Sequence, residues 1–123
     1  MATKRLPKGV TRRADGVLEK LTPHFDAGQM KAMVAQHGDR CFTLSSRQGY
    51  QAMRLSEQEA EAAILAMDPT ACFYKSMTSM ANETLWQDVY HVPTPKGAAY
   101  VKVQLYLPPD GGEPKAVISF KAK

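Results

Sequence analysis

The side chains of this protein that are best suited to chemistry are basic, aromatic and amide groups. They stand in segments that have the composition of β-strands. They are Lys75, Gln87, Tyr100, Lys102 and Lys121. A lysine ammonium neutralises phosphate, a tyrosine ring stacks on an unpaired base, and a glutamine amide bonds a base edge or a sugar hydroxyl. This set suits RNA, although composition alone favours a simpler interpretation, an ordinary polar sheet face.

The period of two along the last strands decides which of these side chains share a face. From 100 to 107, apolar residues occupy the odd positions, and Tyr100 and Lys102 stand at even ones. Successive side chains of a strand point to opposite faces, so these two are expected on the polar face. The segment 115–121 alternates in the same way and places Lys121 beside them. Segments 71–78 and 85–92 should neighbour them, but their mixed alternation fixes no face for Lys75 or Gln87.

The remaining pattern predicts an α+β domain. Helices are expected over 26–38, from Ser45 or Ser46 to Met53, and over 56–67, with extended structure over 40–44. The third helix has a capping box of Ser56 and Glu59 and ends at Asp68-Pro69. Together with the strands, these helices predict an antiparallel β-meander whose apolar face is covered by the N-terminal helices.

Length and composition fit one soluble domain. The chain has 123 residues, of which 44% are hydrophobic and 23% charged, enough to bury a core. No apolar run approaches the roughly 20 residues that cross a bilayer, and the N-terminus lacks the apolar stretch of a secretory signal. A cytoplasmic location is therefore expected. The net charge of +4 permits phosphate contact without deciding it.

Residues 1–18 are expected to form a basic, flexible arm, and residues 19–123 a single domain. Basic residues such as Lys4 and Arg5 outnumber acidic ones in the arm, and glycine and proline interrupt any period. At most a short helical turn is expected near Val17 to Leu21. The arm is either a solvated tail or an electrostatic handle for RNA or an acidic partner.

No metal or cofactor site is expected. Cys41 and Cys72 lack the spacing of a zinc site and are interpreted as reduced core residues. The histidines are scattered, with no second ligand at helical or hairpin spacing. Glu57, Glu59 and Glu61 crowd the start of a helix, where the dipole favours negative charge, and are interpreted as a solvated face.

Four short strings of residues follow the order and spacing of a known family. They are Phe73-Tyr74-Lys75-Ser76-Met77-Thr78, Trp86-Gln87-Asp88-Val89-Tyr90, Tyr100-Val101-Lys102 and Ile118-Ser119-Phe120-Lys121. Together they resemble the MqsR family, bacterial toxin–antitoxin mRNA interferases with a fold similar to that of the RelE toxins. The first two strings are the specific part of the resemblance. It begins near Glu19 and runs to the C-terminus, and the helical region matches only in pattern.

The resemblance implies a ribosome-independent endoribonuclease that cuts single-stranded mRNA at short sequences containing GC. It implies four catalytic residues, Lys75, Gln87, Tyr100 and Lys121. It also implies a cognate antitoxin that is MqsA-like, binds zinc and carries a helix-turn-helix. The toxin would act on DNA only indirectly, through this antitoxin. No cofactor and no membrane partner are implied.

The chemistry of such a cleavage sets the expected roles. Attack by the 2′-hydroxyl needs a base for the hydroxyl, positive charge on the phosphorane and an acid for the departing 5′-oxygen. Neighbouring lysines lower one another's pKa, so Lys75 and Lys121 are assigned to phosphate stabilisation and proton transfer, in either order. Tyr100 is assigned to proton transfer or sugar orientation, and Gln87 to positioning a phosphate or base. The expected products, without metal, are a 2′,3′-cyclic phosphate and a 5′-hydroxyl.

Residues beside these four are candidate RNA contacts: Tyr74, Met77, His91 and Lys102. His91 stands where an arginine is expected in the family, which bears on sequence preference, and the alternative is a titrating group in the reaction. The 108–114 loop is longer than the family pattern and would either change the sequence preference or block RNA. Two other functions stay open. One is a relative that has lost cleavage and serves as an antitoxin-binding module in transcriptional regulation. The other is an unrelated small α+β RNA-binding domain.

Overall fold

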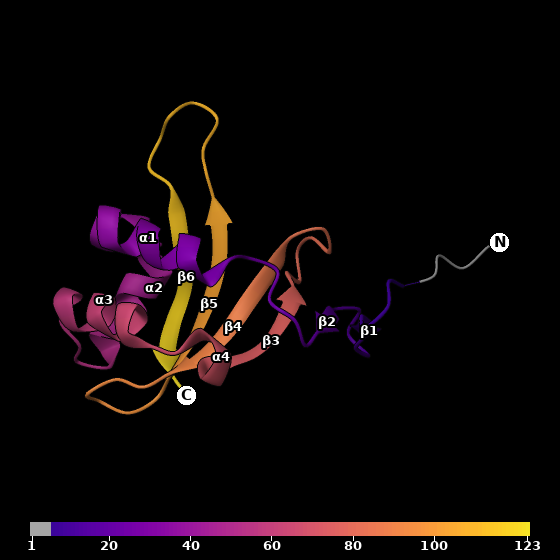
Figure 1. The fold of residues 1–123 in the computed structure, drawn as a ribbon, viewed down its shortest axis with the longest axis horizontal. Coiled ribbons are helices and arrows are strands. Elements are labelled where there is room, and N and C mark those ends of the chain that lie inside the picture. Colours follow the sequence, from indigo (N-terminus) through magenta and orange to yellow (C-terminus); the bar gives the residue numbers. More distant parts are fainter. Residues whose placement is uncertain (1–5) are drawn as a thin grey trace.

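The fold is built on one antiparallel sheet whose strands follow one another in chain order (Figure 1). The computed structural model describes residues 6–123. Within them the strands are β1 (Thr11–Arg12), β2 (Leu18–Lys20), β3 (Phe73–Thr78), β4 (Trp86–Val92), β5 (Ala99–Tyr106) and β6 (Lys115–Ala122). Every neighbouring pair is antiparallel, so the predicted α+β class and the meander are confirmed.

The helices lie between β2 and β3, and side-chain caps start the α-helices but not the 3-10 helix. They are α1 (Ala27–His37), the 3-10 helix η1 (Gly38–Cys41), α2 (Leu44–Ala52), α3 (Glu57–Ala66) and α4 (Pro69–Cys72). Asp26 caps α1 and Thr43 caps α2, while Ser56 and Glu59 form the predicted capping box of α3 in both directions. These side chains accept hydrogen bonds from first-turn amides that have no partner within the helix.

Two expectations about local structure hold only in part. The segment 40–44 is extended at Phe42, which forms a parallel bridge with Val117, and at Thr43, which caps α2 in place of a later serine. Its first two residues end η1, and Leu44 begins α2. The strand expected from Ala71 begins at Phe73. Asp68 accepts from the amides of the next turn and starts the short helix α4, whose first residue is a proline.

The segment predicted as a basic arm contains β1 and the first residue of β2, the two strands at one edge of the sheet. β1 pairs with β2, and β2 pairs with β3, so much of this segment continues the domain (Figure 1). A strand stands where a helical turn was expected near Val17 to Leu21, because Glu19 and Lys20 are in register with β3. Lys4 and Arg5 lie outside the described residues. The flexibility of the arm and its boundary at residue 18 stay predictions.

One hydrophobic core joins the helices to β4, β5 and β6. The Tyr50 ring of α2 packs edge-on against Phe42 and Phe120, with centroids 5.8 and 6.0 Å apart. From β5 the core takes Val101 and Val103, as the alternation predicts. Leu107, expected on the same face, is 73% exposed. It follows the end of β5, where the chain runs out into the projecting loop before β6 (Figure 1).

The cysteines belong to this helical side of the molecule. Cys41 is buried and Cys72 partly buried, and both are free. Burial raises the pKa of the Cys41 thiol to about 11, which keeps it protonated and unreactive. Among the described residues, no helix is both long and apolar enough to cross a membrane.

Helix α2 packs directly on the backbone of β6 at Gly49. A Cβ built at this glycine would lie 1.6 Å from the carbonyl oxygen of Phe120. No side chain fits there, so the residue that weakens the helix locally is required by the close approach of helix and strand.

We expect Gly49→Ala to lower the free energy of unfolding by about 1–3 kcal/mol or more, because a main chain must shift to admit the methyl group. Chemical denaturation measures the change. Gln48→Ala, at the exposed neighbouring position of α2, is the matched control and should change stability by less than about 0.5 kcal/mol. Equal stability of the two variants would contradict the close approach.

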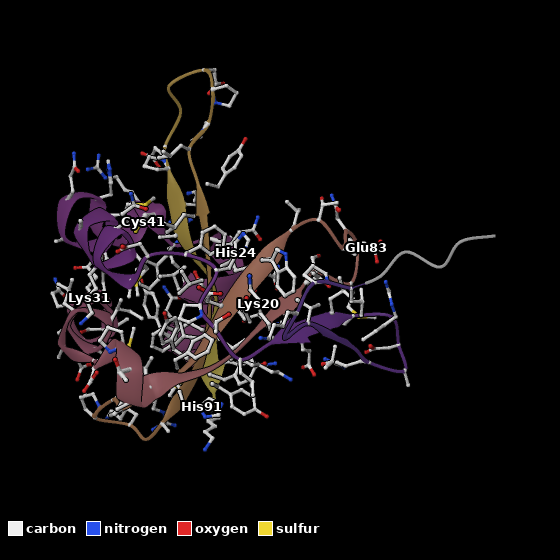
Figure 2. All side chains as sticks on the ribbon, turned by 45° about the vertical axis from the view of Figure 1, so that its right-hand side comes forward. Lys20, His24, Lys31, Cys41, Glu83 and His91 are labelled. Carbon is white, nitrogen blue, oxygen red and sulfur yellow. The ribbon has the colours of Figure 1, made fainter. Side chains whose placement is uncertain are left out.

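A buried carboxylate ties the segment before α1 to β4. Asp88 is fully buried and accepts from the backbone amides of His24, at 2.9 and 3.0 Å, and of Phe25, at 2.8 Å. The His24 ring, labelled in Figure 2, stacks on Trp86 with centroids 5.7 Å apart. The ammonium of Lys20 lies 4.3 Å from the centre of the same indole. Asp88 therefore fixes the entry of the chain into α1.

Asp88→Asn should destabilise the fold by about 1.5–3 kcal/mol, because hydrogen bonds to a buried charge are replaced by weaker ones and one amide is left unsatisfied. The emission of Trp86, the single tryptophan, should shift as the His24 segment loosens. Fluorescence during urea unfolding reports both effects. Asp110→Asn, in the exposed loop before β6, is the control. Equal stability and equal Trp86 emission of the two variants would refute the role of Asp88 in holding the segment before α1.

Candidate active site

The sheet face that points away from the core carries three rows of side chains that cross the strands. Residues opposite one another in an antiparallel sheet lie side by side, so strand pairing and ring contacts define each row. The amide row is Glu19, Met77, Gln87 and Gln104; the lysine row is Lys75, Val89, Lys102 and Ser119; the aromatic row is Tyr74, His91, Tyr100 and Lys121.

The aromatic row is a stack of rings with an ammonium group near each end. Tyr74 and His91 have ring centroids 4.4 Å apart at 25°, and His91 and Tyr100 have centroids 5.8 Å apart at 41°. Lys75 lies 5.2 Å from the centre of the Tyr74 ring, and Lys121 lies 5.4 Å from that of Tyr100. Rings beside cations are the combination that holds unpaired bases and their phosphates.

Burial sets the protonation of the two inner rings. It lowers the pKa of His91, and the charge of Lys123 lowers it further, so the imidazole is neutral at neutral pH. A neutral ring stacks on tyrosine without bringing a charge into the row. Burial also raises the pKa of Tyr100, so its hydroxyl keeps the proton and is able to donate a hydrogen bond.

Lys102 lies at the centre of the positive charge on this face. Burial lowers its pKa, and Lys121, Lys75 and Arg13 lower it further. The sequence analysis assigned proton transfer to lysines because neighbouring lysines lower one another's pKa. In the structure the lysine with the lowered pKa is Lys102, which was predicted to contact RNA.

A small apolar cluster supports the face near the strand β2. Val17, Met77 and Val89 are buried together, and Tyr100 packs against them. Met77, predicted as an RNA contact, is only 7% exposed. It therefore supports the face from below and offers little surface to RNA.

Gln87 is less close to the other predicted catalytic residues than they are to one another. Its side-chain nitrogen donates to the Gln104 side-chain oxygen at 3.4 Å, in the amide row. The lysine row separates it from Tyr100 and Lys121. The structure thus brings Lys75, Tyr100 and Lys121 onto two adjacent rows and places Gln87 at one side of them.

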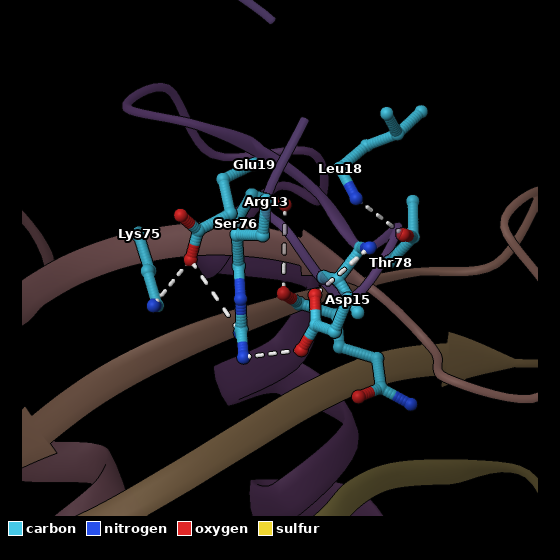
Figure 3. Close-up of polar contacts among 9 residues, drawn as sticks. Arg13, Asp15, Leu18, Glu19, Lys75, Ser76 and Thr78 are labelled. Atoms are coloured by element: carbon cyan, nitrogen blue, oxygen red, sulfur yellow. Dashed lines mark hydrogen bonds and ion pairs between the residues drawn. The ribbon is translucent and has the colours of Figure 1, made fainter. Parts of the chain in front are cut away.

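The face also contains a carboxylate that sequence analysis did not assign to it. Glu19 of β2 contacts the ammonium of Lys75 through Oε2, and a guanidinium nitrogen of Arg13 lies 3.8 Å from the same oxygen (Figure 3). Arg13 also pairs with Asp15 at 2.6 Å. No periodic pattern near the N-terminus could have placed Glu19 here, because its position depends on the pairing of β2 with β3.

A cluster of three acidic residues lies away from this face, on other elements. In the described part of the chain, oxygens of Asp39, Glu57 and Glu61 come within 4.8 Å of one another. Asp39 belongs to η1 and the two glutamates to α3, so none stands in the three rows. Glu59, considered with them in the sequence, serves in the capping box.

Comparison with known proteins shows the family of this chain. Residues 22–122 match the family described as motility quorum-sensing regulator, toxin of MqsA. The mRNA interferase toxin MqsR of Escherichia coli (strain K12) is 30% identical over 106 residues, covering 86% of this chain and 100% of that protein. The family match contains every member of the three rows except Glu19. The chain therefore belongs to the MqsR toxin family.

Proposed function

We propose that the chain is a ribosome-independent endoribonuclease, an mRNA interferase toxin that cuts single-stranded mRNA at short sequences containing GC. The family and the name of the E. coli relative support a toxin endoribonuclease. The observation that carries the proposal is the meeting of the lysine row and the aromatic row on one face. Cations for phosphates lie there beside rings for unpaired bases.

The aromatic row accounts for the preference for single strands. Tyr74 is 48% exposed, so its ring can receive a base. In a duplex the faces of the bases are already stacked on one another, whereas a single strand offers them freely. Lys102 and His91 border the same surface and are proposed to contact the RNA beside Tyr74.

Four residues are assigned to the reaction. Lys75 and Lys121 stabilise the charge of the phosphorane and take part in proton transfer. The protonated hydroxyl of Tyr100 orients the ribose or the phosphate by donating a hydrogen bond. Gln87 positions a phosphate or a base edge. The 2′-hydroxyl attacks the adjacent phosphorus, and the 5′-oxygen of the next nucleotide leaves.

The partner that restrains this activity is proposed to be a cognate antitoxin. The description of the family as the toxin of MqsA supports an antitoxin partner. An MqsA-like antitoxin that binds zinc and carries a helix-turn-helix would connect the toxin to DNA, and both would act in the cytoplasm.

Lys75→Ala and Lys121→Ala should each slow cleavage of a defined single-stranded mRNA by about 10²-fold or more, because each removes a cation from the phosphorane. Cleavage by the purified chain, followed by mapping of the cut ends, measures the loss. Lys96→Ala, in the exposed loop between β4 and β5, is the matched control and should cut like the parent. Parent-like rates for both site variants would overturn the roles of these lysines. If the parent does not cut RNA but binds its antitoxin, the enzyme assignment falls and the binding-module hypothesis is favoured.

Cleavage should continue in EDTA and should leave a 2′,3′-cyclic phosphate and a 5′-hydroxyl, because lysines supply the positive charge that a metal would otherwise provide. Enzymatic end-labelling distinguishes a 5′-hydroxyl from a 5′-phosphate at the cut. A 5′-phosphate, or loss of all cutting after chelation, would contradict the proposed chemistry.

A further inference from the structure

The carboxylate of Glu19 stands among the cations proposed to hold the scissile phosphate. From its position we propose that Glu19 is the general base that takes the proton of the attacking 2′-hydroxyl. This inference rests on the proposed function, and it supplies a group that the four assigned residues lack, a carboxylate proton acceptor.

The geometry leaves one oxygen of this carboxylate available. The contacts to Lys75 and Arg13 both use Oε2 (Figure 3). Among residues 6–123, Oε1 of Glu19 has no hydrogen-bond or ion-pair partner. The side chain is 23% exposed and borders a hollow of about 200 Å³ that Lys75 also lines. Glu19 is thus held by one oxygen, while the other has no partner in the described part of the chain and is left to accept from a hydroxyl.

The other carboxylates near this face are occupied elsewhere. Asp88 is fully buried and accepts from the amides of His24 and Phe25. Asp15 pairs with Arg13 through one oxygen and accepts from the Val17 amide through the other. Glu19 is the acid whose position and free oxygen suit a proton acceptor.

The contact with Lys75 couples proton transfer to charge stabilisation. Before reaction the Glu19 carboxylate offsets part of the charge of the Lys75 ammonium. When Glu19 takes up the proton, its negative charge disappears, and the full charge of Lys75 acts on the phosphorane at the moment negative charge develops there. One contact therefore serves both requirements of the first bond-making step.

The complete step balances without any further reactant. The 2′-oxygen bonds to phosphorus as its proton moves to Glu19, and the bond from phosphorus to the 5′-oxygen breaks. The 5′-oxygen takes a proton from Lys102 or Lys121, and a 2′,3′-cyclic phosphate remains. Solvent returns the protons afterwards.

Single-turnover cleavage of a defined single-stranded RNA by the full chain tests the role. Glu19→Gln keeps the shape and removes the proton acceptor, so the rate should fall by about 10²- to 10⁴-fold. Glu83→Gln is the matched control. Glu83 lies outside the three rows and pairs at 3.2 Å with Arg12 of β1, the strand that pairs with the strand of Glu19. It should cut like the parent, and thermal unfolding should show both variants folded.

Two further readouts separate a base from a structural ion pair. The pH profile of the parent rate should contain a limb that Glu19→Gln lacks, because only the parent has a carboxylate proton acceptor at this position. Added formate should restore part of the rate of Glu19→Ala, because a small carboxylate can occupy the space and accept the proton. A purely structural role would leave the shape of the pH profile unchanged and give no rescue.

The outcomes distinguish this inference from the proposed function. If Lys75→Ala is inactive while Glu19→Gln cuts at the parent rate or faster, the ribonuclease assignment stands and the base assignment falls. A slow Glu19→Gln with a parent-like pH profile, and no formate rescue of Glu19→Ala, also overturns it. If the parent does not cut RNA, the proposed function fails and the base assignment fails with it.

Discussion

Each central strand must fit a dry core on one face and a charged surface on the other, and the rest of the structure depends on this constraint. On β5, Val101 and Val103 are buried in the core, while Tyr100 and Lys102 stand on the opposite face. A slip of one residue would bury the lysine and expose both valines, at a cost in hydrophobic burial and in desolvation of charge. The register that protects the core is therefore the register that aligns the three rows.

The sequence predicted the strands and the helix whose signals are local, but it could not assign the faces of the strands that are covered on both sides. β5 was predictable because only one of its faces is dry, and α3 because its capping box lies within one turn. In β4, Val89 on the outward face is buried under the β2 hairpin, and Asp88 on the inward face is polar because it binds backbone amides. The irregular pairing of β3 between Phe73 and Lys75 interrupts its alternation as well.

The missed parts of the site are contacts between distant segments. Glu19 meets Lys75 across 56 positions of sequence, and nothing in the composition of the N-terminal segment indicates that it pairs with β3. Gly49 indicates a weak helix when read locally, yet its meaning lies in the Phe120 carbonyl of the last strand. Propensity and alternation describe one segment at a time, so contacts of this kind become visible only when the strands are assembled.

The charges on the face must also be compatible with a stable fold in the absence of RNA. Lys75, Lys102, Lys121 and Arg13 lie near one another, and like charges at short range oppose their own assembly. Glu19 offsets this repulsion by pairing with Lys75 and Arg13, and Asp15 contributes by pairing with Arg13. An RNA phosphate brings the same sign of charge as these carboxylates. A bound phosphate therefore opposes the charge of Glu19, and proton uptake by this carboxylate as the 2′-oxygen attacks relieves that opposition.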